Sequence, residues 1–150
     1  MATEQWRPVP GFEGEYEVSS EGRVRSLART VVRRNGSPMT IPAKEKSQRI
    51  LENGYMQVYL WSAGKARGFF VHRLVLLAFV GVPDDPKMEA HHGPDPNRQN
   101  NRLANLRWVT KSENIREAME RKRTRLDILA ELAHVGRQSV RNDNEGEVPF

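Results

Sequence analysis

Residues 91–114, HHGPDPNRQNNRLANLRWVTKSEN, constrain the fold more than any other segment of this 150-residue chain. The middle of the segment is too polar for regular structure, so it predicts a long, organised loop between short strands at 88–92 and 106–110. A helix is expected to follow, because Thr110 can cap it and Glu113 completes a capping box. The order strand, long loop, strand and helix therefore defines the core of the chain.

The same segment places chemically useful side chains on both sides of the long loop. His91 and His92 end the first strand, and Asn114 lies in the first turn of the helix. A strand–loop–strand–helix arrangement brings these two points together and creates a solvent-open pocket lined by imidazole and amide oxygen and bordered by arginines. Such a pocket can hold one divalent cation and one water molecule.

The N-terminal half of the chain predicts mostly strands. Residues 11–27 favour a β-hairpin that turns at residues 20–22, because apolar valines alternate there with polar neighbours. Residues 28–49 are polar and basic and contain prolines and an Asn-Gly pair, so we expect an extended, loosely held arm. Residues 55–61 and 69–71 are rich in β-branched and aromatic residues and predict a second hairpin with a basic, glycine-containing loop.

Helices are expected at two further places. The apolar residues of HRLVLLAFV, from His72 onward, follow helical spacing and predict a short core helix. A second helix is expected at about 126–135, followed by a frayed end. We interpret the three tryptophans, Trp6, Trp61 and Trp108, as core anchors rather than as platforms for base stacking.

Charge is distributed unevenly along the chain, which has a net charge of +5 and a pI near 9.9. Residues 23–49 carry a net +7 and residues 98–125 a net +6. Two separate basic stretches indicate a polyanionic partner, since each neutralised phosphate releases counterions. Solvated loops and a charged helix face would give the same charge pattern.

Composition excludes several classes of protein. The chain has no Cys, which removes disulfides, thiolate zinc sites and cysteine nucleophiles together. It has no apolar run of about 18 residues and no signal-peptide pattern in MATEQWRPVP. We therefore expect no membrane partner and a cytoplasmic, intracellular location.

The segment around the two histidines resembles the catalytic core of HNH endonucleases, the ββα-metal fold, in the variant whose key residues are His, Asn and Asn. His92, Asn105 and Asn114 match these positions, NNRLANLRW is a distinctive string, and VHRLVLLAF is similar to the usual lead-in of the family. Residues 6–27 resemble the small NUMOD-type module that is often fused to HNH domains in phage and intron-encoded homing endonucleases. The resemblance covers about 6–27 and 71–119.

The resemblance implies a role for each matching residue. His92 would accept a proton from the attacking water, and Asn105 would tie the long loop to the strand and so hold His92 in place. His91 and Asn114 would be the metal ligands. Many relatives have Asp or Asn at the position of His91, and imidazole is a softer ligand that favours Mn²⁺, Ni²⁺ or Zn²⁺ over Mg²⁺.

Supporting residues and DNA contacts complete the predicted site. His72 and Asn101 are candidates for active-site support. Basic side chains are expected along the DNA backbone, where phosphate contacts position a protein without reading the sequence, and Lys65 and Arg67 are expected on the loop of the second hairpin. The predicted DNA-binding residues are Arg23, Arg25, Arg29, Arg33, Arg34, Lys65, Arg67, Arg107, Lys111 and Arg116.

The sequence therefore predicts an α+β protein, with a small N-terminal antiparallel β-rich module, a ββα-metal HNH nuclease core and a short helical tail. The predicted boundaries are 1–50 for the NUMOD-like, DNA-contacting module with its basic arm, 51–124 for the HNH domain with its core at 88–123, and 125–150 for the tail.

The expected function is metal-dependent hydrolysis of phosphodiester bonds in double-stranded DNA, in one strand or both, giving 5′-phosphate and 3′-hydroxyl ends. The expected cofactor is one divalent cation, Mg²⁺ or Mn²⁺ with Ni²⁺ or Zn²⁺ as alternatives, and no small-molecule cofactor; monomer and dimer both stay open. One alternative is a catalytically inactive DNA-binding protein on an HNH scaffold, which His91 would favour. The other is a zinc-stabilised structural module, which four dispersed His and no Cys disfavour.

Overall fold

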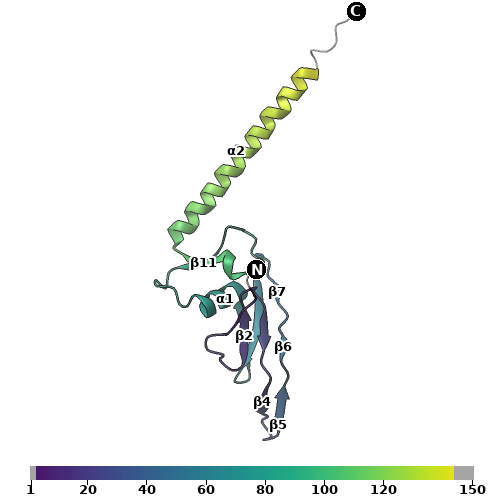
Figure 1. Cartoon of the computed structure of the whole chain (residues 1–150), viewed down its shortest axis with the longest axis vertical. Helices are drawn as coiled ribbons and strands as arrows, with labels where there is room; N and C mark the ends of the chain where they lie inside the picture. The colour runs from purple at the N-terminus through teal and green to yellow at the C-terminus, as the bar shows by residue number, and fades with distance from the viewer. Residues whose placement is uncertain (1–2, 144–150) are drawn as a thin grey trace, which may run out of the picture. The chain divides into compact units, whose positions relative to one another are not determined.

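The computed structural model describes residues 3–143, which divide into two compact units. The first unit ends at Val109 and contains every strand, and the second begins at Thr110 and contains one helix. Figure 1 draws the chain and labels both α-helices and several of the strands. None of the helices in the described part of the chain has the length and hydrophobicity that a transmembrane span requires.

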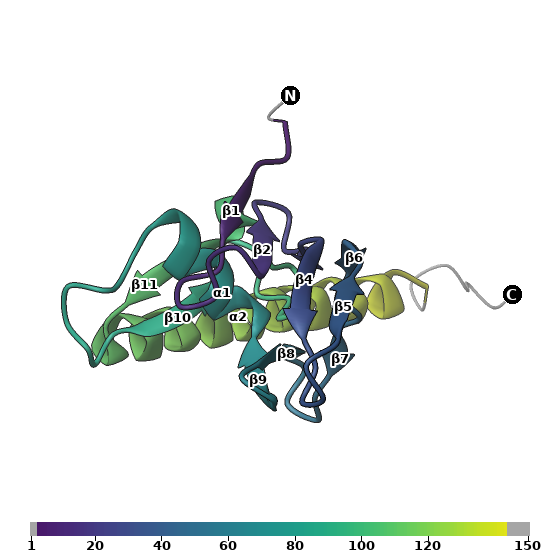
Figure 2. The same ribbon diagram turned by 90° about the horizontal axis from the view of Figure 1, so that it is seen from below.

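The strands of the first unit pair antiparallel in four groups. Their orders are β1-β2-β3-β6, β4-β5, β7-β8-β9 and β10-β11, and Figure 2 shows the β4–β5 and β8–β9 hairpins. The bounds are β1 (Trp6–Pro8), β2 (Tyr16–Ser19), β3 (Val24–Ser26), β4 (Arg29–Val32), β5 (Pro38–Ile41), β6 (Lys44–Glu45), β7 (Arg49–Ile50), β8 (Met56–Ser62), β9 (Lys65–Phe70), β10 (Glu89–His92) and β11 (Leu106–Val109).

One core joins β2, β3, β8 and β11 to helix α1 (Val71–Phe79), which contacts β1, β2, β8, β9, β10 and β11. The apolar side chains on one face of α1 are almost fully buried in this core, as the helical spacing predicts. Each fully buried Val or Leu contributes about 1.5–3 kcal/mol, so this shared cluster holds the first unit together. The cluster consists of Val9, Tyr16, Val18, Val24, Val58, Leu60, Val71, Leu74, Val75, Leu76 and Leu106.

Several predictions of local structure are confirmed. The chain turns between β2 and β3 at residues 20–22, α1 forms where the helical spacing begins, and β10 and β11 flank a polar loop that ends in a short 3₁₀ helix, η1 (Leu103–Asn105). The predicted capping box is present, because Thr110 N donates to the Glu113 carboxylate at 2.8 Å and Glu113 N donates to Thr110 Oγ1 at 3.2 Å. The α+β class is confirmed as well.

The loosely held arm expected for residues 28–49 is wrong. Half of this segment forms strands, and β4 and β5 pair around a turn that contains Asn35 and Gly36. Asn-Gly is among the strongest signals for a tight hairpin, and it outweighs the polar composition. Lys65 and Arg67 likewise lie within strand β9 rather than in the hairpin loop, because the turn is confined to Ala63 and Gly64.

Two further expectations are corrected. A single helix, α2 (Lys111–Asp143), replaces the predicted pair of helices, because the chain between them has no Gly or Pro to end the first. The frayed end is expected for residues 142–150; Asn142 and Asp143 belong to α2, and the rest lies outside the described residues. Trp61 is not a core anchor, since it is 55% exposed on β8, whereas Trp6 and Trp108 are half-buried.

Candidate active site

The β10–β11 hairpin positions the two adjacent histidines. In its register His91 lies opposite Arg107 and His92 lies opposite Leu106. Successive side chains of a strand point to opposite faces, so the two imidazoles lie on different sides of the hairpin. Each histidine is only 6% exposed, and the strand end therefore offers two buried rings in different surroundings.

His92 is fixed by a side-chain hydrogen bond. Its Nε2 lies 2.8 Å from Oδ1 of Asn101, which is itself buried. Because a carboxamide oxygen can only accept, Nε2 carries the proton and the lone pair of the neutral ring lies on Nδ1. Burial lowers the pKa of His92 most, with His91 and Arg98 lowering it further, while Asn101 and Asp95 act in the opposite direction. The ring is therefore held neutral in a single tautomer.

Asn105 organises the loop that follows His92. Its Oδ1 accepts from Asp95 N at 2.8 Å, and its Nδ2 donates to Asp95 O at 2.9 Å and to Asn100 O at 3.1 Å. Its backbone carbonyl also accepts from Gly93 N at 2.9 Å. Asn105 thus ties the polar loop 93–105 together, which is the structural role that the sequence predicts for it. Its effect on catalysis stays a prediction.

The turn between β2 and β3 packs directly on this loop. Ser20 O accepts from Leu103 N at 2.8 Å, and Glu21 pairs with Arg102 at 2.9 Å. Gly22 is buried at φ +84°, and a Cβ built there would lie 2.8 Å from Asn101 Cβ and 2.9 Å from Asn101 O. The N-terminal hairpin therefore sets the position of Asn101 and, through it, of His92.

A cluster of rings surrounds His92 on its other side. His72, at the start of α1, lies 4.9 Å from the His92 ring and stacks on Tyr55 at 5.0 Å, and Tyr55 itself lies 5.9 Å from His92. His72 is 6% exposed, and its Nδ1 is buried with no hydrogen-bond partner among the described residues. Burial lowers the pKa of His72 to about 3, and the neighbouring His92 and Arg73 act in the same direction. His72 is therefore a neutral packing partner of His92.

Sequence reasoning missed two residues beside His92. Tyr55 reads as an ordinary strand residue, and Arg98 is one of many arginines in a polar loop. The Arg98 guanidinium lies 4.7 Å from the centre of the Tyr55 ring and donates to the backbone carbonyl of Asn53. No local pattern could predict this contact, because the turn at 53–55 and the loop at 93–105 meet only in the folded chain.

The two predicted metal ligands lie in different units. His91 is buried in β10, and Asn114 lies in the first turn of α2, where its backbone N–H donates to Thr110 O at 3.0 Å. Within the described part of the chain, no three His, Asp or Glu side chains gather as a metal site. The assignment of His91 and Asn114 as metal ligands therefore stays a prediction.

Three of the predicted DNA-binding arginines are already engaged within the protein. Arg25 lies over the Trp6 ring at 3.9 Å and pairs with Glu17 at 2.7 Å. Arg23 pairs with Glu4 and Glu45 at 3.0 Å each, and its guanidinium lowers the pKa of Glu45. Arg29 donates to Glu15 O at 2.9 Å and lies over Tyr16.

The other predicted DNA-binding residues are exposed. Two of them lie at the β4–β5 turn, two on β9, one on β11 and two in the first turns of α2. These residues are Arg33, Arg34, Lys65, Arg67, Arg107, Lys111 and Arg116.

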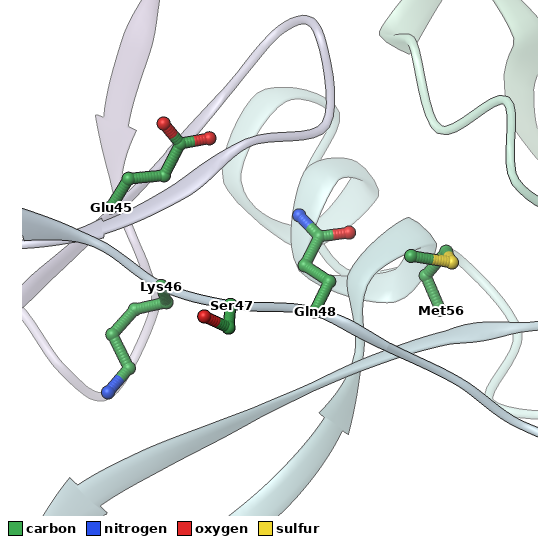
Figure 3. A pocket seen from close by; sticks show the side chains of 5 residues that line it. All are labelled: Glu45, Lys46, Ser47, Gln48 and Met56. Carbon is green, nitrogen blue, oxygen red and sulfur yellow. The ribbon is translucent and has the colours of Figure 1, made fainter.

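A surface pocket near β6 and β8 offers little chemistry. It is lined by Glu45, Lys46, Ser47, Gln48 and Met56, as Figure 3 shows. Glu45 is paired with Arg23, and Gln48 Nε2 donates to Gly22 O at 2.8 Å. These side chains brace the β2–β3 turn, and none of the histidines lines this pocket.

Comparisons with known proteins agree with the geometry. Residues 4–61 match the NUMOD4 motif, and residues 69–116 match the HNH endonuclease family. The chain is 31% identical over 134 residues to DNA endonuclease I-HmuI of Bacillus phage SP01, covering 89% of this chain and 68% of that protein. It is 32% identical over 121 residues to an uncharacterized HNH endonuclease of Acanthamoeba polyphaga mimivirus, covering 79% of this chain and 27% of that protein.

A solved structure extends the likeness to three dimensions. The structure described as DNA binding and cleavage by the HNH homing endonuclease I-HmuI superposes with a TM-score of 0.63 at 30% identity, over 87% of this chain and 68% of that chain. Both motifs, the whole-chain identity and the shared fold lead to one assignment. The chain belongs to the HNH endonuclease family and carries an N-terminal NUMOD4 motif.

Proposed function

We propose that this enzyme is a metal-dependent endonuclease that hydrolyses phosphodiester bonds in double-stranded DNA, with His92 as the general base. The observation that carries the proposal is the 2.8 Å contact between His92 Nε2 and Asn101 Oδ1, which leaves the Nδ1 lone pair for proton transfer. The name of I-HmuI, a DNA endonuclease, supports DNA as the substrate.

The proposed reaction is an in-line attack of water on phosphorus. His92 Nδ1 takes a proton from the water as its oxygen bonds to phosphorus, and the bond from phosphorus to the 3′ oxygen breaks. The 3′ oxygen takes a proton from solvent, so the products carry 5′-phosphate and 3′-hydroxyl ends. A divalent cation held by His91 and Asn114 would supply positive charge to the scissile phosphate and the leaving oxygen.

Three residues would act through His92 rather than on the substrate. Asn101 fixes its tautomer, Asn105 closes the loop that carries Asn101, and His72 packs against its ring. A general base typically contributes about a hundredfold to ten-thousandfold to the rate, so misplacing it is costly. We therefore assign these residues positioning roles.

The exposed basic residues would bind the DNA backbone. Arg33, Arg34, Lys65 and Arg67 are exposed on two hairpins of the first unit, and exposed cations can release counterions from phosphate. Arg23 would contribute less, because a phosphate would have to replace its two carboxylate partners. An enzyme that cuts double-stranded DNA inside cells would act in the cytoplasm of a bacterial or phage-infected cell.

The test is cleavage of supercoiled plasmid by wild type and His92→Ala in EDTA, Mg²⁺, Mn²⁺, Ni²⁺ or Zn²⁺, with DNA binding measured separately by gel shift. We expect metal-dependent conversion to nicked or linear DNA by wild type, no conversion by His92→Ala, and similar binding by both. Binding without cleavage in any cation would refute the proposal and support the inactive DNA-binding protein. The ratio of nicked to linear product gives the number of strands cut.

A further inference from the structure

Arg98 is exposed, yet three contacts hold it in place. Its NH1 donates to the backbone carbonyl of Asn53, and its guanidinium carbon lies 4.7 Å from the centre of the Tyr55 ring. Its aliphatic stem packs over Gly54, where an added Cβ would lie 3.6 Å from Arg98 Cδ. A long charged side chain is ordinarily mobile, so this anchoring reduces the conformational entropy that a contact with a ligand would cost.

One ring, Tyr55, links the anchored guanidinium to the proposed general base. Arg98 lies over the Tyr55 ring, and the centre of that ring is 5.9 Å from the centre of the His92 ring. No carboxylate pairs with Arg98 in the part of the chain that the structure describes, unlike Arg23, Arg25 and Arg102. The site therefore holds a fixed positive charge whose partner is not a protein carboxylate.

We propose that Arg98 binds a nonbridging oxygen of the scissile phosphate, and that the turn at 53–55 positions it to do so. The inference rests on the proposed function, because it assumes that the His92 site cuts a phosphodiester. Guanidinium has five N–H donors, and the bond to Asn53 leaves a fork of donors for phosphate oxygens. Negative charge grows on these oxygens during attack, so a fixed cation stabilises the transition state more than the bound substrate.

This arrangement crosses the boundary between the two sequence motifs. Asn53, Gly54 and Tyr55 belong to the NUMOD4 match, whereas Arg98 and His92 belong to the HNH match. The N-terminal motif would thus complete the active site, in addition to contacting DNA.

The chain offers a closely matched control for Arg98. Arg7 is also exposed, lies 4.8 Å from the centre of the Phe79 ring, and donates through NH1 to the Phe79 carbonyl at 3.3 Å. Arg7→Ala therefore removes the same kinds of contact as Arg98→Ala, but at β1. Arg98→Lys retains a charge without the planar fork.

The experiment measures single-turnover nicking of supercoiled plasmid at saturating enzyme, with duplex binding by fluorescence anisotropy and folding by circular dichroism. We expect Arg98→Ala to lower the rate at saturation by roughly 10²–10³-fold, a range seen on losing one transition-state donor, while affinity changes only a few-fold. Arg98→Lys should recover part of the rate, and Arg7→Ala should cleave like wild type. Added guanidinium ion, below denaturing concentration, should raise the rate of Arg98→Ala alone, which a purely structural role would not produce.

Each other outcome has a definite meaning. If Arg98→Ala cleaves at the wild-type rate once bound, Arg98 does not act on the scissile phosphate and the inference is overturned, whereas the proposed function stands. If Arg98→Ala is slow, unfolded and not rescued by guanidinium, the residue is structural and the inference is again overturned. If wild type binds DNA but cuts it in no cation, the proposed function fails first and this inference fails with it.

Discussion

Replacing Gly22 by alanine tests how the β2–β3 hairpin turn positions the active-site loop. Gly22 is buried at φ +84°, in the left-handed region that residues with a Cβ avoid. Its added methyl would also lie 2.8 Å from Asn101 Cβ and 2.9 Å from Asn101 O. Neither atom belongs to the far end of a flexible side chain, so the turn and the loop would have to move apart.

Two penalties combine at this position. The left-handed backbone costs an alanine about 1–2 kcal/mol, and relieving an overpacked contact costs about 1–3 kcal/mol more. Gly36 provides a control for the first penalty alone, because its φ is +83° and nothing lies within 4 Å of its added Cβ. For a chain of this size each kcal/mol lowers the melting temperature by roughly 2–4 °C. Gly22→Ala should therefore melt clearly below Gly36→Ala.

Cleavage distinguishes local displacement from general destabilisation. Moving Asn101 away should break its 2.8 Å hydrogen bond to His92, so the rate should fall further than the folded fraction explains. The assay is plasmid nicking by both variants at a temperature where circular dichroism shows each to be folded. Equal melting temperatures and equal rates for Gly22→Ala and Gly36→Ala would refute the close approach of the turn to Asn101 and its proposed effect on catalysis.

Three further perturbations probe other parts of the first unit. Asn105→Ala removes three side-chain hydrogen bonds of a buried amide, and urea unfolding should show a loss of about 2–4 kcal/mol; a loss below 1 kcal/mol would contradict its place in the loop. The pKa of His72 in the folded protein is about 3, so below about pH 6.5 only the unfolded state binds a proton at this residue. The free energy of unfolding should therefore fall by about 2 kcal/mol between pH 7 and pH 5. His72→Phe should flatten that pH dependence in urea titrations, and an unchanged slope would argue against a buried neutral ring. Replacing both Arg33 and Arg34 by alanine should reduce the slope of log affinity against log salt concentration by about 2. Arg23→Ala should reduce this slope by less than half of that amount, because Arg23 is paired with two carboxylates. An equal reduction per arginine would mean that this pairing does not restrain Arg23.

The sequence could predict the elements that depend on neighbours in the chain. The capping box at Thr110, the turn at 20–22 and the apolar spacing of α1 each express a local preference that the fold retains. The β4–β5 hairpin was predictable from Asn35-Gly36 as well, had composition carried less weight. The predicted break within α2 failed because polar composition alone does not end a helix.

Contacts between distant segments could not be predicted in this way. Asn101 is one of three asparagines within 100–105, and only the fold shows that it, rather than Asn105, contacts the His92 ring. Trp61 has the composition of a core residue, but its register on β8 places it on the exposed face. Residue type indicates chemistry, whereas strand register and packing decide which side chain reaches the site.

Two glycine turns of the NUMOD4 segment contact the loop of the HNH segment. Gly22, at φ +84°, approaches Asn101, and Gly54, at φ +85°, lies against Arg98. Asn101 in turn fixes His92, and Arg98 lies beside the Tyr55–His92 rings. The HNH segment by itself would therefore keep His92 and Asn101 but lose the two turns that pack on Asn101 and Arg98. A functional exchange of NUMOD4 segments between relatives must preserve both turns.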